Sequence, residues 1–318
     1  MLESILYSIN NIMPIFIIVI FGAVLGKIGF VNDEFLSVCD KLVFKITLPC
    51  MLFVEIVSAK SVGFNPMLIG YCIAAVPVCL ILSCLIVPVF LKDNAKRGAF
   101  IQGIYRSNAA IIGLTLAQNM FPENGTATMS TVMPFVVVLF NGFAVVILSI
   151  YAPADVKLAP RKLFVRILKT VATNPLIISI VLALLWKLTG ITLPVLADKS
   201  LNYLADMSMP LALISLGASF KVESLRGRFK LALMSSALKT IVVPAAAVLC
   251  AIPLGFRGVE LGTIFIIFGG PASVSSYIMS KQMKSDHELA GQILLVSTLM
   301  SVVTLFAGTL ILKQTGLI

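Results

Sequence analysis

The chain has 318 residues, of which 59% are hydrophobic and only 12% are charged, and its mean hydropathy is +1.06. Soluble proteins are about half apolar and about a quarter charged, so this composition excludes a soluble or disordered chain and predicts a protein of the lipid bilayer. The net charge of +10 requires no nucleic-acid partner, because the cytoplasmic loops of membrane proteins are rich in Lys and Arg.

Ten apolar runs are long enough to cross a bilayer, which takes about 20 mostly apolar residues each. They cover roughly residues 10–28, 35–57, 66–91, 96–118, 127–150, 163–187, 193–219, 230–254, 258–281 and 288–313. The longest connection, 151–162, is predicted to be a cytoplasmic linker between residues 1–150 and residues 163–318. The sequence therefore predicts an all-α polytopic membrane protein with ten transmembrane helices.

Lysine and arginine are distributed unevenly between the two sides of this layout. Most of them lie in or beside the connections that follow spans 1, 3, 5, 7 and 9. Since cytoplasmic loops carry the excess of basic residues, both termini are predicted to face outward. The expected location is the cell inner (plasma) membrane.

Residues that would carry enzyme chemistry are sparse. His287 is the only histidine, and the sequence has neither an HExxH motif nor a complete Walker motif. The six cysteines, all in apolar runs, are interpreted as small buried hydrophobes. They are Cys39, Cys50, Cys72, Cys79, Cys84 and Cys250. We therefore expect no enzyme activity, no metal site and no cofactor, with the identity of any coupling ion (H⁺ or Na⁺) left open.

A shift of 161 residues aligns the two halves of the chain without a gap. It places Pro14 on Pro175, Gly29 on Gly190 and Pro49 on Pro210. Each half then holds five spans, and because five is odd, the halves must have opposite orientations in the membrane. Inverted repeats of this kind are typical of secondary transporters. Pro49 and Pro210 are predicted helix breaks.

Two spans that correspond under this shift carry helix-breaking residues near the bilayer midplane. Span 9 contains Gly269-Gly270-Pro271, where two flexible residues precede one that has no N–H. Span 4 contains Asn108 at the corresponding depth, followed by Gly113. In a broken helix, the N-terminal end of each half carries partial positive charge and unpaired N–H groups, which favour the binding of an anion. We predict that broken helices 4 and 9 cross at a substrate site, with Gly113 and Pro271 as hinges.

The candidate substrate ligands are the polar and backbone groups of this crossing. They are Arg106, Ser107, Asn108, Gly269, Gly270, Pro271, Ala272 and Ser273, together with Asn141 of span 5. Asn108 can both donate and accept hydrogen bonds, and Arg106 offers a bidentate fork to a carboxylate. The alternatives stay open: Arg106 pairs with Glu55 or Asp206 or reaches toward the cytoplasmic surface, and the serines bond to the preceding helical turn.

Other ionisable residues also fall within the apolar runs. Asp40, Lys41 and Lys45 lie near a predicted cytoplasmic end, where they are expected to reach the surface. Lys239 lies deeper, and the sequence offers no partner for it.

With these residues in this order, the sequence resembles the auxin efflux carrier family, in its bacterial short form, over essentially the whole chain. The marks are Pro14, Gly22 and Gly29 in span 1, Leu48-Pro49 in span 2, Ser107-Asn108 and Gly113 in span 4, and Pro271 before Ser280-Lys281 in span 9. Two features depart from the plant members, which place a proline where this chain has Ser107 and carry a long central loop where this chain has only 151–162. The first departure weakens the expectation of a break in span 4. The short loop resembles the bacterial short form and argues against auxin as the substrate.

The resemblance implies a fold similar to that of the bile-acid sodium symporters. In such a fold, spans 1, 2, 6 and 7 form a scaffold, and spans 3–5 and 8–10 form a transport unit that moves like an elevator. The substrate is expected where spans 4 and 9 cross, and a homodimer is expected to form through the scaffold.

The predicted function is secondary transport of small organic anions by alternating access, with mono- or dicarboxylates such as malate or malonate as substrates. The alternatives are a sodium-coupled bile-acid-type symporter and a channel or receptor for small anions. The direction of flux stays open.

Overall fold

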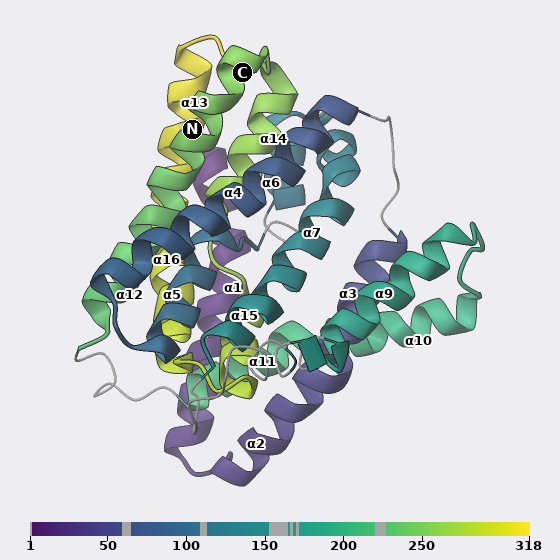
Figure 1. The fold of residues 1–318 in the computed structure, drawn as a ribbon, viewed down its shortest axis with the longest axis vertical. Helices are drawn as coiled ribbons and strands as arrows, with labels where there is room; N and C mark the ends of the chain where they lie inside the picture. Colours follow the sequence, from purple (N-terminus) through teal and green to yellow (C-terminus); the bar gives the residue numbers. More distant parts are fainter. Residues whose placement is uncertain are drawn as a thin grey trace.

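The computed structural model describes residues 2–58, 65–108, 113–152, 165, 168–169, 172–219 and 227–318. Within these ranges the chain is helical and contains no strand (Figure 1). The first half contains α1 (Leu2–Lys27), α2 (Asp33–Leu42), the π-helix η1 (Val43–Thr47), α3 (Leu48–Ser58), α4 (Pro66–Phe90), α5 (Asn94–Tyr105), α6 (Leu114–Met120) and α7 (Gly125–Ile150). The second half contains α9 (Pro175–Leu188), α10 (Val195–Asp206), α11 (Ser208–Ala218), α12 (Phe229–Ala237), the π-helix η4 (Leu238–Val242), α13 (Val243–Ala251), the 3₁₀ turn η5 (Ile252–Leu254), α14 (Gly258–Gly269), α15 (Val274–Gln282) and α16 (His287–Gln314).

Among the described residues, five helical segments are long and apolar enough to cross a membrane. They are Pro66–Phe90, Gly125–Ile150, Phe229–Leu254, Gly258–Gln282 and His287–Gln314. Shorter apolar helices lie at Phe16–Lys27 and Pro175–Leu188. The prediction of an all-helical membrane protein is confirmed at this level, whereas the count of ten spans and the inversion of the halves stay predictions. The predicted linker 151–162 lies almost entirely outside the described residues.

Two of the predicted spans are distorted just before a proline. The π-helix η1 ends two residues before Pro49, and the turn at Met207 between α10 and α11 comes three residues before Pro210. A proline within a helix removes one hydrogen bond, and its ring clashes with the carbonyl four residues earlier. Lys45 and Asp206 carry those carbonyls, and they lie in η1 and at the end of α10. The prolines therefore account for both irregularities.

Gly29 and Gly190, which coincide under the shift of 161 residues, have the same local conformation. Each lies two residues after the last residue of its helix, Lys27 in α1 and Leu188 in α9. Their φ angles are +74° and +68°, in the left-handed region that ends many helices and that costs glycine little. The two halves thus share a local helix stop at corresponding positions.

Helices from the two halves pack directly on one another. α1 packs against α11, and α3 packs against both α9 and α10. These helices are labelled in Figure 1. A Cβ atom on Gly22 of α1 would lie 2.5 Å from the carbonyl oxygen of Ile214, and one on Gly217 would overlap the backbone at Val19. Small residues allow such close backbone contact between membrane helices.

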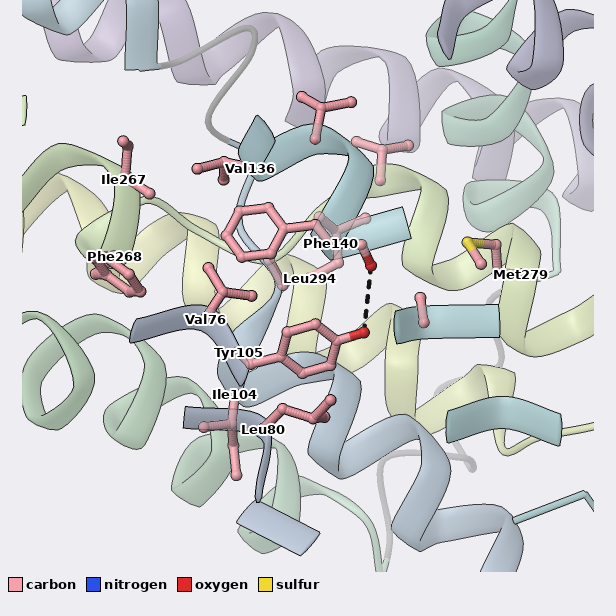
Figure 2. Packing of buried hydrophobic residues seen from close by; sticks show 14 of the residues in the cluster. Val76, Leu80, Ile104, Tyr105, Val136, Phe140, Ile267, Phe268, Met279 and Leu294 are labelled. Carbon is pink, nitrogen blue, oxygen red and sulfur yellow. Dashed lines mark hydrogen bonds between the residues drawn. The ribbon is translucent and has the colours of Figure 1, made fainter. Parts of the chain in front are cut away.

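α5, α14 and α15 are buried along most of their length. Figure 2 shows Tyr105 among Leu80 of α4, Phe140 of α7 and Ile104. The Tyr105 hydroxyl donates a hydrogen bond to the Phe140 carbonyl at 3.3 Å, so this polar atom is satisfied inside the core. Of the most apolar 18-residue stretch of Gly258–Gln282, 94% is buried. This segment therefore lies inside the helical bundle.

The cysteines follow their predicted role only in part. All six are free thiols, and Cys39 and Cys72 are buried. Cys250 of α13 is exposed, so the expectation that all six are buried is wrong for this residue. A free cysteine behaves as a small hydrophobe, which suits a helix face turned toward lipid.

Candidate functional site

Two helix breaks meet in the interior of the molecule. α5 ends at Tyr105, and Arg106 is extended at φ −85° and ψ 128°. α14 ends at Gly269, and α15 begins after Ser273, which is also extended. The Asn108 N–H donates a hydrogen bond to the Pro271 carbonyl at 2.8 Å. This bond satisfies backbone groups that the breaks would leave unpaired in an apolar environment.

The contact between the breaks depends on a glycine. A Cβ atom on Gly270 would lie 2.5 Å from Ser107 Oγ, closer than two such atoms can approach. Gly270 therefore lets the two irregular segments touch, which explains a glycine at this position more directly than flexibility does.

A small cavity lies beside this contact. Its polar wall consists of Glu55, Arg106, Ser107, Asn108, Asn141, Ser273 and Ser275. Apolar residues of α3, α7 and α9 complete the wall. The water-accessible volume is about 30 Å³, enough for one or two water molecules. A carboxylate would require the surrounding helices to separate.

Arg106 is almost completely buried and is held by neutral groups. Its Nη1 lies 2.8 Å from Met279 Sδ, and its Nη2 donates to Asn141 Oδ1 and to Ser275 Oγ, each at 2.5 Å. The Asn141 amide is oriented by its own bond to the Val137 carbonyl at 2.8 Å. Within the described structure this guanidinium is bonded only to neutral acceptors, so no ion pair neutralises its charge.

Comparison with known proteins decides the family. The family of membrane transport proteins known as auxin efflux carriers matches residues 7–307. The chain belongs to this family. An uncharacterized transporter of Methanocaldococcus jannaschii is 24% identical over 307 residues, which cover 92% of this chain and 95% of the relative. Another uncharacterized transporter, from Methanothermobacter thermautotrophicus, is 20% identical over 306 residues, with 94% of this chain and 96% of the relative covered.

Five of the nine predicted ligands of this transporter line the cavity. They are Arg106, Ser107, Asn108, Asn141 and Ser273. Ser107 Oγ is buried without a hydrogen-bond partner in the described structure, and the side-chain amide of Asn108 has no bond to any described residue. These polar groups are available to a ligand.

The other four predicted ligands do not line the cavity. Gly269, Gly270, Pro271 and Ala272 are buried but do not line the cavity. The Ala272 N–H donates to Ser297 Oγ at 3.1 Å, and the Pro271 carbonyl accepts from Asn108. Their observed contacts position the breaks. Gly113 is buried and immediately precedes α6, while 109–112 lie outside the described residues.

Among the described residues, Arg106 forms an ion pair with neither carboxylate that the sequence offered. Asp206 is exposed and does not line the cavity, and Glu55 lines the cavity but is not bonded to Arg106. Ser275 accepts from Arg106 and shares a 2.8 Å hydrogen bond with Ser273, so neither serine is bonded to the preceding turn.

Glu55 and Met279 were not among the predicted ligands. A carboxylate inside an apolar run is a functional candidate by default, and that signal was present at Glu55. Nothing in the sequence marks Met279, because a thioether in an apolar helix is ordinary core material.

Two charged residues outside the cavity have specific partners. Asp40 of α2 is fully buried, and Lys281 Nζ lies 2.6 Å from its Oδ2. The expectation that Asp40 reaches the surface is therefore wrong, because an ion pair holds it inside. Lys239 Nζ donates to the Phe268 carbonyl at 3.0 Å, next to the end of α14.

Proposed function

We propose that this transporter carries small organic anions, mono- or dicarboxylates such as malate or malonate, by alternating access. The observation that carries the proposal is the cavity in which a buried Arg106 lies beside Ser107 and Asn108, whose side chains have no hydrogen-bond partner among the described residues. An arginine without a carboxylate ion-pair partner favours an anion, and a guanidinium binds a carboxylate through two parallel hydrogen bonds.

The half-helix α15 supports the same substrate class. Its first residues follow Ser273, and both Ser273 and Ser275 line the cavity. The N-terminal end of a helix carries partial positive charge and unpaired N–H groups. An anion held between Arg106 and this helix end would meet favourable charge on two sides.

The walls of the cavity come from both units of the proposed elevator. α3 and α9 belong to the predicted scaffold, whereas α7, α15 and residues 106–108 belong to the predicted transport unit. A relative movement of the units would widen a volume of about 30 Å³ and expose it to one side at a time. The matching helix stops at Gly29 and Gly190 support the inverted repeat.

The resemblance to the family also bears on the oligomeric state and the membrane location of the protein. We infer a homodimer through the scaffold, a multi-pass location in the cell inner (plasma) membrane and both termini outside. Both chain ends lie toward the same end of the molecule (Figure 1), as an even number of spans requires.

Uptake into proteoliposomes tests the proposal. Purified protein is reconstituted, and entry of labelled malate and malonate is measured with the wild type and with Asn108→Ala. Asn202→Ala is the matched control, because this asparagine of α10 bonds only to Asp198 of its own helix. We expect uptake by the wild type and the control, and loss of most uptake by Asn108→Ala. Equal uptake by the wild type and Asn108→Ala would contradict the site.

The same assay separates the alternative functions. Uptake that requires a sodium gradient would identify a sodium-coupled symporter. Ion currents far above the turnover of a carrier would identify a channel, and binding of malonate without any flux would identify a receptor.

A further inference from the structure

Glu55 is the only carboxylate among the described residues that line the cavity, and Arg106 is the only cation. Glu55 lies on α3, in the predicted scaffold, and it is only partly buried. Arg106 lies on the opposite wall, in the predicted transport unit. The two groups of opposite charge therefore share one small volume but belong to different units of the elevator.

Glu55 and Arg106 line the same cavity without forming an ion pair. No oxygen of Glu55 lies within 4.0 Å of an Arg106 nitrogen in the described structure. Within the described structure, the Glu55 side chain has no hydrogen bond at all. The Arg106 guanidinium instead bonds to Asn141, Ser275 and Met279. A carboxyl that has no hydrogen-bond or ion-pair partner among the described residues keeps both oxygens available to accept a proton.

The other charged or titratable groups of the surrounding elements do not enter the cavity. They are Cys50 of α3, Lys45 of η1, Lys187 of α9, Asp198, Lys199, Tyr203 and Asp206 of α10, Lys96, Arg97 and Tyr105 of α5, and Tyr277 and Lys281 of α15. α7 carries no charged side chain. Lys187 Nζ donates to the Ile56 carbonyl at 2.9 Å, and Lys281 pairs with Asp40. The charge of the cavity is therefore set by Glu55 and Arg106.

An anion that enters changes this charge balance. When Glu55 and Arg106 are both ionised, their charges cancel, and an added carboxylate leaves the cavity with a net negative charge beside Glu55. Like charges in an apolar enclosure disfavour each other strongly, and protonation of one carboxyl relieves the repulsion. A proton on Glu55 leaves the Arg106 charge free to balance the anion.

We propose that Glu55 is the proton-binding residue of this transporter, and that one proton enters with each anion. On the loading side, the Glu55 carboxylate takes a proton from water as the anion binds beside Arg106. On the release side, the anion leaves, and Glu55 returns the proton to water. No other bond forms or breaks. The inference rests on the proposed transport of carboxylates and adds the coupling ion.

Uptake of labelled malonate driven by a pH gradient tests the inference. The membrane potential is clamped, and the accumulation of malonate is measured with the inside of the proteoliposomes more alkaline than the outside. For one coupled proton, wild-type accumulation at equilibrium should rise by up to about tenfold per unit of pH difference. Glu55→Gln cannot bind the proton, so its accumulation should not respond to the gradient. Glu34→Gln, at the exposed start of α2, is the matched control and should respond like the wild type.

A second measurement does not depend on the folding of the Glu55 variant. In weakly buffered detergent solution, a pH indicator reports the protons that wild-type protein takes up when malonate is added. We expect about one proton per malonate bound, since the carboxyl must be neutralised. Binding without proton uptake would overturn the inference.

The outcomes separate the two proposals. A wild type that takes up malonate but does not respond to the pH gradient would overturn only the role of Glu55. A Glu55→Gln variant that accumulates malonate like the wild type would do the same. No uptake of malonate or malate by the wild type would overturn the proposed function, and the inference with it.

Discussion

Lys281 of α15 and Asp40 of α2 form an ion pair in which Nζ lies 2.6 Å from Oδ2. Ser215 of α11 donates to the other oxygen of Asp40, and Lys281 also bonds to Ser219 Oγ at 3.1 Å. The cluster joins the predicted transport unit to the predicted scaffold. It lies apart from the cavity, so it can be altered without removing a cavity-lining residue.

Removal of one partner of this pair should destabilise the protein more than removal of both. Lys281→Met leaves the fully buried Asp40 carboxylate without its cation, and we expect a loss of about 2–4 kcal/mol in the free energy of unfolding. The double variant Asp40→Asn with Lys281→Met leaves no unpaired charge and should recover part of that loss. Chemical unfolding in detergent measures both.

An exposed ion pair provides the control for this comparison. Lys96 and Asp93 approach to 3.5 Å with both side chains accessible, so Lys96→Met should change the free energy of unfolding by about 0.5 kcal/mol or less. A double variant of Asp40 and Lys281 that is as unstable as the sum of its single variants would mean that the two residues do not interact.

The two helix ends at Tyr105 and Gly269 could be predicted from sequence because glycine, proline and polar residues within an apolar run mark a break by their residue type. Gly269-Gly270-Pro271 interrupts a helix in any context, and a polar Asn108 within an apolar run points to a non-lipid environment. The contact of Asn141 with the crossing followed from the same rule, and its bond to Arg106 is observed.

The face that α3 presents to the cavity could not be predicted. The π-helix η1 precedes α3 and inserts extra backbone into the helical turn, which changes the direction of every later side chain relative to α2. Whether Glu55 points to lipid, to the scaffold or to Arg106 therefore depends on this local irregularity and on packing against α9 and α10. Periodicity along the apolar run contains neither piece of information.

The hydrogen bonds of Arg106 predict a strict requirement for a guanidinium. In Arg106→Lys, one ammonium cannot reach Asn141, Ser275 and Met279 together and also bind a carboxylate bidentately. We expect binding of malonate to weaken by about 10- to 100-fold, the range for loss of a hydrogen bond to a charged group. Isothermal titration of purified protein measures the affinity.

Arg97 is a suitable control for the same substitution. This arginine lies at the start of α5, outside the cavity, and bonds to the Pro88 carbonyl and the Asn94 side chain. Arg97→Lys should leave malonate affinity within about twofold of the wild type, since the cavity is unchanged. An Arg106→Lys protein with wild-type affinity would show that Arg106 does not bind the anion.

The contact of α1 with α11 predicts that Gly217 tolerates no side chain. A Cβ atom there would overlap the backbone at Val19, so Gly217→Val should force the helices apart at a cost of about 1–3 kcal/mol. Gly70 of α4 has open space around its Cβ position, and Gly70→Ala should be neutral or stabilising by up to about 1 kcal/mol. Only the Gly217→Val unfolding curve should therefore shift toward lower stability, and an equal loss of stability in the two variants would count against the close packing.

Gly29 and Gly190 should respond alike to substitution because each ends a helix in the left-handed region, at +74° and +68°. An L-residue in that conformation costs about 1–2 kcal/mol, and neither glycine has a neighbouring atom that a methyl group would meet. Gly29→Ala and Gly190→Ala should thus each lower the free energy of unfolding by this amount through backbone strain alone. Gly142→Ala, in the regular helix α7 and also without close neighbours, should not. Because strain is local, the free energy of unfolding of the double variant should fall by the sum of the two single losses. A fall well below this sum would show that one of the two turns relaxes to another conformation.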